Sequence, residues 1–185
     1  MSPRPQVDKG GTPHGNPLTV EGAADPRTDL DQGFKIRKAR GDEFAAIKRM
    51  SAEQTFLELD EFEWQDRESI KRDHLERLDL FFKRPGNEFY VVEAKDGKMA
   101  GYVWFGVSER PFSGTKVGWV YEIEVVPEYR RRGIGEVLLR HALKVSKERG
   151  FSQTGLMVNQ KNKVASSLYE KVGFQTEFRL MSRRN

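Results

Sequence analysis

One stretch of the chain runs from a strand through a glycine turn into a helix, and this order constrains the fold more than any other feature. The stretch is PEYRRRGIGEVLLRHALKV, residues 127–145. Apolar residues recur in its second half at the spacing of one helical face, and Gly150 stands where a C-terminal cap is expected. The preceding run VGWVYEIEVV, residues 117–126, predicts a strand. The helix must therefore begin where that strand ends.

The turn has the chemistry of an anion site. The first four backbone N–H groups of a helix have no partner within it, and the helix dipole adds partial positive charge there. Gly133 and Gly135 carry no Cβ atom that would keep a bulky anion from those amides, and residues 130–132 are all arginine. The P-loop pattern is absent, and Leu138 occupies the third glycine position of the dinucleotide fingerprint. The turn therefore predicts a phosphate site of another kind.

The remaining elements predict a mixed sheet. Six runs of β-forming residues predict strands, at residues 34–39, 88–94, 98–107, 117–126, 152–158 and 174–182. Asp96-Gly97 supplies a tight hairpin turn between the second and third of these strands. Four runs with helical spacing predict helices, at residues 41–54, 68–84, 133–149 and 162–172. This order predicts an antiparallel meander followed by a right-handed βαβ crossover with parallel strands.

Length and composition indicate one folded domain without a metal centre. Residues 1–33 are rich in proline and glycine and nearly lack large apolar side chains, which predicts a disordered tail before a single domain, residues 34–185. The absence of cysteine excludes disulfides, thiolate metal sites and a cysteine nucleophile. The 3 histidines are scattered without metal-ligand spacing, so no metal site is expected.

Charge and hydropathy narrow the expected partners. No apolar run approaches the length of a bilayer span and no signal-peptide hydrophobic region is present, so we expect a cytoplasmic protein without membrane contact. The formal net charge is +4, but acidic and basic residues alternate through most of the chain. The excess positive charge is therefore weak evidence for nucleic-acid binding.

Two motifs together resemble one protein family. Arg130, Gly133 and Gly135 fit the pattern Arg/Gln-x-x-Gly-x-Gly/Ala, and residues 162–174, NKVASSLYEKVGF, fit Asn-x-x-Ala-x-x-Leu-Tyr-Glu-Lys-x-Gly-Phe. In this order and spacing they resemble the GNAT-type N-acetyltransferase superfamily, whose cofactor is acetyl-CoA. The resemblance covers roughly residues 34–182. It implies an α/β (α+β) fold, a mixed and mostly antiparallel sheet of six to seven strands with one parallel βαβ crossover, flanked by about four helices.

The resemblance also implies a cofactor site between two strands. In the family, the strands equivalent to residues 117–126 and 152–158 splay apart, and the pantetheine arm pairs with exposed backbone, here that of Ile123 and Val125. The amides of residues 131–136 would hold the pyrophosphate, and Asn162 would contact the arm. The Glu136 carboxylate is then expected to point away from the phosphate. The implied cofactor-binding residues are Ile123, Val125, Arg130, Arg131, Arg132, Gly133, Ile134, Gly135, Glu136 and Asn162.

Acetyl transfer to an amine needs a base, because a lysine-like amine with a pKa of about 10.4 is protonated at neutral pH. Glu122 and Glu124 share a face of the predicted strand, so either could take the proton directly or through water, or both could simply meet solvent. Some relatives place this glutamate on the following strand, where this chain has Met157. The resemblance makes Tyr169 the general acid, with a packing role as the alternative. The Val125 N–H would stabilise the oxyanion.

The acceptor is expected to be a primary amine, with a positive charge. Residues 53–68 are acidic with interleaved Phe56, Phe62 and Trp64, and in the family this segment usually lines the acceptor groove. A polyamine, an amino sugar, a peptide N-terminus and a lysine side chain all fit. The length of the acyl group and a homodimer stay open.

Two rival functions remain beside an N-acetyltransferase. A non-catalytic acyl-CoA-binding sensor would keep the cofactor site but would need neither the glutamates nor Tyr169. A nucleic-acid-binding domain would use residues 130–132 and the tail, and its affinity would fall steeply with salt. Nucleic-acid binding is the less favoured of the two, because it leaves the motif at residues 162–174 unexplained.

Overall fold

The computed structural model describes residues 33–59, 67–181 and 183. The predicted tail, residues 1–33, lies outside the described residues except for Gly33. The side chains of residues 55–67, which make up most of the acidic segment at residues 53–68, are also outside the described part of the chain. The functional role predicted for that segment therefore stays a prediction.

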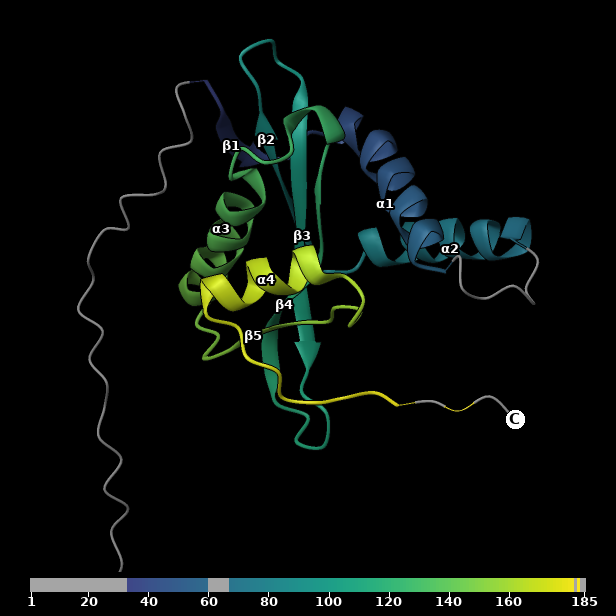
Figure 1. Cartoon of the computed structure of the whole chain (residues 1–185), viewed down its shortest axis with the longest axis vertical. Coiled ribbons are helices and arrows are strands. Elements are labelled where there is room, and N and C mark those ends of the chain that lie inside the picture. Colours follow the sequence, from purple (N-terminus) through teal and green to yellow (C-terminus); the bar gives the residue numbers. More distant parts are fainter. Residues whose placement is uncertain (1–32, 60–66, 182, 184–185) are drawn as a thin grey trace, which may run out of the picture.

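A mixed sheet forms the middle layer of the molecule (Figure 1). Within the described residues it has five strands in the order β1-β2-β3-β4-β5. The strands are β1 Lys35–Lys38, β2 Glu88–Glu93, β3 Met99–Glu109, β4 Lys116–Val125 and β5 Thr154–Leu156. The first four pair antiparallel, and β4 pairs parallel with β5. The predicted meander and parallel crossover are thus confirmed.

The prediction of six to seven strands is wrong for the part of the chain that the structure describes. The last predicted strand does not form, because β5 has only 3 residues and offers no edge long enough to pair with residues 174–181. These residues instead cross the β3–β4 connection, where Arg110 pairs with Glu177 at 3.0 Å and the rings of Phe112 and Phe178 lie 5.9 Å apart. Leu180 stays 97% exposed, so the apolar alternation of this segment is not buried against the sheet.

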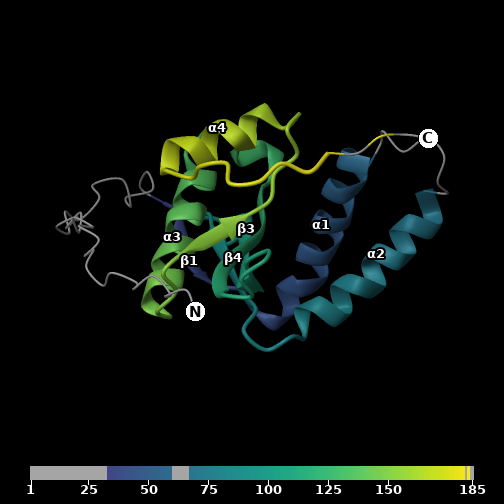
Figure 2. The same ribbon diagram turned by 90° about the horizontal axis from the view of Figure 1, so that it is seen from below.

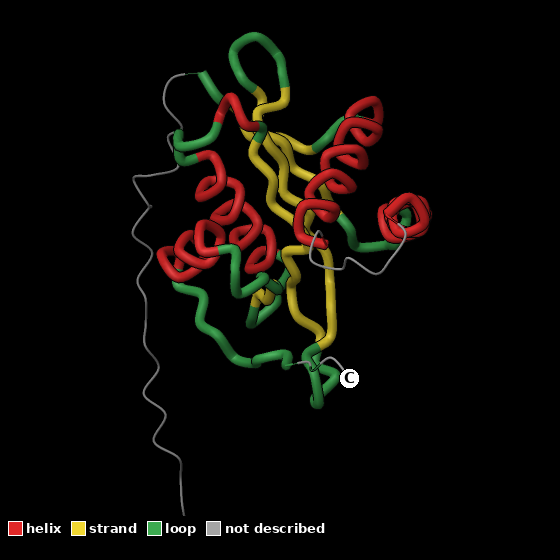
Figure 3. The backbone as a smooth tube through the Cα atoms, turned by 45° about the vertical axis from the view of Figure 1, so that its right-hand side comes forward, coloured by secondary structure: helices red, strands yellow, loops and turns green. Residues whose placement is uncertain are grey.

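Helices cover both faces of the sheet (Figures 2 and 3). The described residues form α1 Phe44–Leu59, α2 Arg67–Phe82, α3 Ile134–Glu148 and α4 Lys163–Val172, with short 3-10 turns at Gly41–Glu43 and Pro127–Tyr129. Helices α1 and α2 lie on one face, and α3 and α4 on the other. Among the helices described, none is both long and apolar enough to cross a bilayer.

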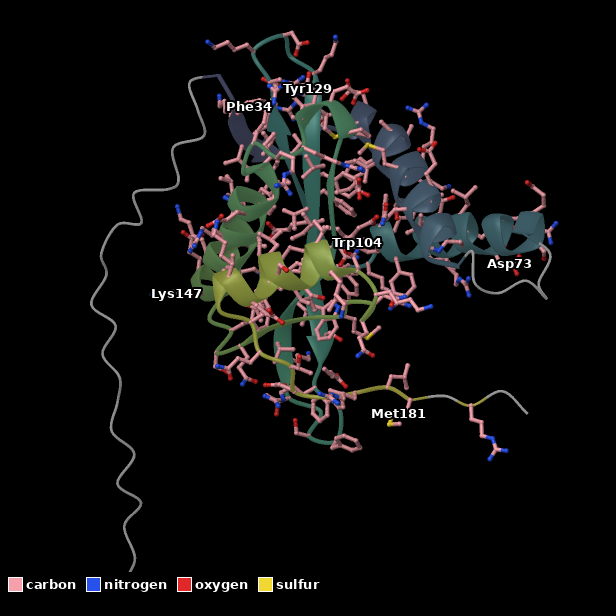
Figure 4. The ribbon with its side chains drawn as sticks, viewed as in Figure 1. Phe34, Asp73, Trp104, Tyr129, Lys147 and Met181 are labelled. Atoms are coloured by element: carbon pink, nitrogen blue, oxygen red, sulfur yellow. The ribbon has the colours of Figure 1, made fainter. Side chains whose placement is uncertain are left out.

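The alternation of side chains along the strands fills two cores. On β3, Val103 and Phe105 belong to the α3-side core, with Ile134 and Leu138 of α3. The α1-side core consists of Ile47, Leu78, Phe89, Val91, Tyr102 and Trp104. Trp104 lies between the sheet and α2, against the rings of Phe81 and Phe82 (Figure 4). The two cores hold β4 and its neighbours in a fixed middle layer.

Candidate active site

The candidate site begins at a β-bulge in β4. Trp104 of β3 pairs with Glu122, and the next residue, Phe105, pairs with Val120, so Tyr121 is an extra residue on β4. Before the bulge Val120 faces the α3-side core, and after it Ile123 and Val125 face that same core. Without the bulge, simple alternation from Val120 would have turned Glu122 toward α3. The bulge therefore sends both candidate glutamates to the α1 side of the sheet.

One edge of β4 is open beyond the bulge. Strand β5 pairs only with the segment from Gly118 to Val120, and no described strand pairs with that edge of β4 further along. The Val126 N–H donates to the carbonyl of Ala100 in the β3 direction at 3.0 Å. Because backbone groups alternate along a strand, the N–H and C=O groups of Ile123 and Val125 point to the open edge. The predicted pantetheine-binding backbone groups are thus on the part of the β4 edge that β5 does not pair.

After the glycine turn, helix α3 begins near the end of this open edge. Gly133 is the N-terminal cap residue with a φ of 79°, and Arg131 also has a positive φ, of 65°. Within the described residues no side chain caps the first turn of α3, so its leading N–H groups keep their capacity to bind an anion. Tyr129 packs on Phe34 with ring centroids 6.0 Å apart, which ties the turn to the start of β1 (Figure 4).

Gly133 and Gly135 of the motif are required to be glycine for different physical reasons. A Cβ atom on Gly133 would meet nothing within 4 Å, so this position needs glycine for its positive φ. A Cβ atom on Gly135 would lie 3.3 Å from a methyl carbon of Leu168 and 3.7 Å from one of Val125. Gly135 therefore lets α3 approach α4 and β4 closely, a packing reason that the sequence argument about anion access did not contain.

Glu136 in the first turn of α3 is neutralised by two cations. Its carboxylate contacts Lys171 of α4 at 2.6 Å and Arg140 at 3.0 Å. The hydrogen bond from Lys171, followed by that from Arg140, lowers the pKa of Glu136, although burial opposes the shift. The negative charge beside the predicted phosphate site is thus largely compensated, and the ion pair with Lys171 joins α3 to α4.

Arg130 is turned toward β4. Its Nε donates to the carbonyl oxygen of Val125 at 3.0 Å, and its Nη2 lies 3.0 Å from Oε1 of Glu124. The guanidinium therefore occupies one of the two carbonyls at the open edge, and it pairs with one of the two candidate bases. Sequence reasoning had counted its charge only toward the phosphate.

The two glutamates lie opposite two buried polar residues of β3. Glu124 pairs in register with Tyr102, and Glu122 with Trp104. Burial first, and then the negative charge of Glu122, raise the pKa of the Tyr102 phenol. The Tyr102 hydroxyl and the Trp104 Nε1 are buried, and no described residue gives either one a hydrogen bond of ordinary geometry. This side of β4 therefore holds two carboxylates beside two buried donors.

Helix α4 brings Asn162 and Tyr169 to the other side of β4. Asn162 caps α4, because its Oδ1 accepts a hydrogen bond from the Ala165 N–H at 3.0 Å. Its NH₂ group, which this cap does not use, could make the predicted contact with a pantetheine arm. Tyr169 packs near Phe174, with ring centroids 6.1 Å apart, at the border of the α3-side core. The predicted acid and the predicted bases thus lie on opposite faces of the sheet.

The remaining predictions concern Met157, a metal site and the residues that surround the glutamates. Met157, which replaces the base of some relatives, follows β5 and is 82% exposed. The described residues contain no cluster of three or more His, Asp or Glu side chains that could hold a metal ion. Sequence reasoning missed Tyr102 and Trp104, although the strand alternation and the hairpin register carry their position. It also missed Arg140, which the i, i+4 spacing from Glu136 signals.

Comparison with known proteins defines the class. The model of the Acetyltransferase (GNAT) family matches residues 53–174, which is more than half of the chain. The chain therefore belongs to the GNAT acetyltransferase family, a class of acyltransferases. It is 27% identical over 158 residues to a mycothiol acetyltransferase of Saccharomonospora viridis, a match that covers 82% of this chain and 49% of that protein.

Two further relatives agree with this class. A Bacillus subtilis protein provisionally named ribosomal protein bS18-alanine N-acetyltransferase is 34% identical over 88 residues, covering 46% of this chain and 53% of that protein. The solved structure of a Pyrococcus furiosus protein provisionally named as an acetyl transferase is 25% identical, with a TM-score of 0.71, and covers 82% of this chain and 99% of that chain. The present chain spans about half the length of the curated relatives it matches.

Proposed function

We propose that this chain is an N-acetyltransferase that moves an acetyl group from acetyl-CoA to a primary amine by direct attack in a ternary complex. The observation that carries the proposal is the open edge of β4. It runs along β4 near the uncapped N-terminus of α3, with Tyr169 on one face of the sheet and Glu122 on the other. The diphosphate of the cofactor would lie at the N-terminus of α3, its extended arm along the open edge of β4, and its reacting carbonyl between Tyr169 and Glu122.

The residues present fit acetyl-CoA as the cofactor. The amides of residues 131–136, in the turn and at the start of α3, would bind the pyrophosphate, since the helix has no side-chain cap and the turn has two positive φ values. The backbone of Ile123 and Val125 would pair with the pantetheine arm, with the amide group of Asn162 nearby. When bound there, the cofactor supplies an activated thioester. The Val125 N–H lies at the open edge, where it can donate to the oxygen that gains charge.

Glu122 is the better base of the two glutamates. Arg130 binds the Glu124 carboxylate at 3.0 Å, so a proton on Glu124 would weaken an ion pair. Glu122 lies two residues nearer the bulge than Glu124, opposite Trp104, and it faces the α1 side, from which we expect the amine to enter. Glu122 takes the proton of the ammonium group directly or through a water, which leaves a neutral amine to attack.

Tyr169 is the proposed general acid. It lies on the α4 side of the open edge, away from the glutamates, where its hydroxyl can give a proton to the leaving sulfur. The separation of acid and base by the sheet means that neither quenches the other. A sensor module would have no use for this arrangement, which is why we favour an enzyme.

The proposed acceptor is a cationic primary amine. Three aromatic rings, those of Phe81, Trp104 and Tyr121, cluster on the face that carries the glutamates, with centroid distances from 4.8 to 6.5 Å. Aromatic faces beside carboxylates suit an ammonium group. The relatives named above act, by their names, on mycothiol or on an alanine of a ribosomal protein, so both a small molecule and a peptide N-terminus stay candidates. We place the reaction in the cytoplasm.

A panel of amines tests the proposal. The full chain is mixed with acetyl-CoA and, in turn, with polyamines, amino sugars, peptides with free N-termini and lysine peptides, and the release of free thiol is measured. We expect amine-dependent release with at least one class and loss of that release in Glu122→Gln. Tight binding of acetyl-CoA in calorimetry, without thiol release from any amine, would instead support the sensor.

A further inference from the structure

Tyr102 is a buried phenol in a position where a phenylalanine would fit. Its side chain is 0% exposed, in the α1-side core between Val91 of β2 and β4. Its hydroxyl makes no hydrogen bond of ordinary geometry with the described residues, although Glu122 and Ser51 both lie near enough to interact with it. A buried hydroxyl without a partner destabilises a fold, so each such group in a native protein asks for an explanation.

The neighbours of the hydroxyl indicate what it serves. The charged groups of β4 that face Tyr102 are Glu122 and Glu124, with Arg130 bound to Glu124. From α1, the buried and uncharged Ser51 is close to the phenol. Because burial and the two carboxylates oppose loss of its proton, the phenol stays protonated and can act as a donor at neutral pH. Glu124 pairs in register with Tyr102, and Glu122 is the diagonal neighbour on the same face of β4. Of the two carboxylates, Glu122 acts more strongly on the phenol, so Glu122 is the one that this donor serves.

We infer that Tyr102 is a positioning residue for Glu122, whose hydroxyl donates to the Glu122 carboxylate and holds it in the orientation that accepts the proton of the incoming amine. This inference rests on the proposed function. Tyr102 keeps its own proton throughout: the proton of the ammonium group moves to Glu122, and the phenol O–H only orients and stabilises the carboxylate before that transfer. The role explains why a polar atom is retained in the α1-side core.

Tyr102→Phe removes the hydroxyl and keeps the ring. We expect kcat to fall by about tenfold, because the base stays in place and only its orientation is lost. The KM for acetyl-CoA should not change. The acidic limb of the kcat/KM profile should move to higher pH, because the carboxylate loses a donor that favours its ionised form. A purely structural role would not move that limb.

Tyr90→Phe is the matched control. Tyr90 is a buried tyrosine of the adjacent strand β2, but its ring belongs to the α3-side core and its hydroxyl contacts Glu88. We expect this variant to keep the kcat and the pH profile of the unchanged chain. Thermal unfolding of both variants reports any loss of folded protein, and rates are referred to the folded fraction.

A second measurement does not depend on activity. The full chain is labelled with carbon-13 in its glutamate carboxyl groups and is titrated by NMR. The signal that is missing from the spectrum of Glu122→Gln identifies Glu122. We expect Glu122 to titrate at higher pH in Tyr102→Phe than in the unchanged chain. An identical titration, together with an identical pH profile, would overturn the role of Tyr102. If Glu122→Gln retains full activity, the proposed base itself fails, which is a separate outcome.

Discussion

Two glutamates that look equivalent in the sequence have different neighbours in the structure. Glu124 is bound by Arg130, whose guanidinium also bonds the Val125 carbonyl. Glu122 lies beside the protonated phenol of Tyr102. A carboxylate that is already paired with a cation is a poorer proton acceptor than one that meets a neutral donor. These single-residue contacts are the reason why we propose Glu122 as the base, where the sequence left a choice.

Paired amide variants test this assignment. We expect Glu122→Gln to lower kcat by about 100-fold, because the amide cannot accept the ammonium proton. Glu124→Gln should lower kcat by less than about tenfold, since it removes only the partner of Arg130. Steady-state rates at saturating acetyl-CoA measure both. A larger loss in Glu124→Gln than in Glu122→Gln would reverse the assignment.

At the scale of single elements, one bulge and one turn bring together the residues of the candidate site. The extra residue Tyr121 changes which β4 side chains face α1, so it places Glu122 and Glu124 together with Tyr102. The turn at Gly133 starts α3 without a side-chain cap, and α3 then packs on α4 through Gly135. The fold thus leaves a helix N-terminus and an unpaired strand edge next to each other.

Gly133→Ala tests the turn. Because Gly133 has a φ of 79°, we expect alanine to lower the free energy of unfolding by about 1 kcal/mol and to weaken acetyl-CoA binding, while Gly133→Asn should do both to a smaller degree. Gly97 in the β2–β3 hairpin has the same φ and open surroundings, so Gly97→Ala is a matched control. We expect that control to lose similar stability with unchanged affinity in calorimetry. Equal loss of affinity in both variants would contradict the assignment of the turn.

The ion pairs of Glu136 give α3 a pH-dependent anchor. Its pKa is lowered in the folded chain by Lys171 and Arg140, so its contribution to stability is complete above the ordinary glutamate pKa of about 4.3 and is lost as the pH falls through the lowered value. We expect Glu136→Gln to lower the free energy of unfolding by roughly 1 kcal/mol at pH 7, with the difference shrinking as the pH falls below the ordinary glutamate pKa and vanishing below the lowered one. Urea unfolding over a series of acidic pH values measures this. A difference that persists at low pH would point to packing rather than charge.

At the scale of the whole molecule, most of the architecture was accessible from the sequence. The hairpin at Asp96-Gly97, the strand before the glycine turn and the amphipathic α3 rest on local signals, and all three formed. The last predicted strand is absent from the described residues, and its apolar alternation carried no information that β5, its expected neighbour, stops after 3 residues. The bulge at Tyr121 was also hidden, since it depends on the register between two strands. The contacts of Arg130 with Glu124 and of Tyr102 with Glu122 depend on which way the β4 side chains face, so they could not be predicted from the sequence either.

The central claim is that the uncapped amides of α3 and the open edge of β4 together bind acetyl-CoA. A crystal structure of the full chain with saturating coenzyme A tests this most directly. The account predicts the diphosphate against the amides of residues 131–136 and the arm along the backbone of Ile123 and Val125, with Arg130 displaced from the Val125 carbonyl. Density for the cofactor at any other place, or none at saturation, would contradict it.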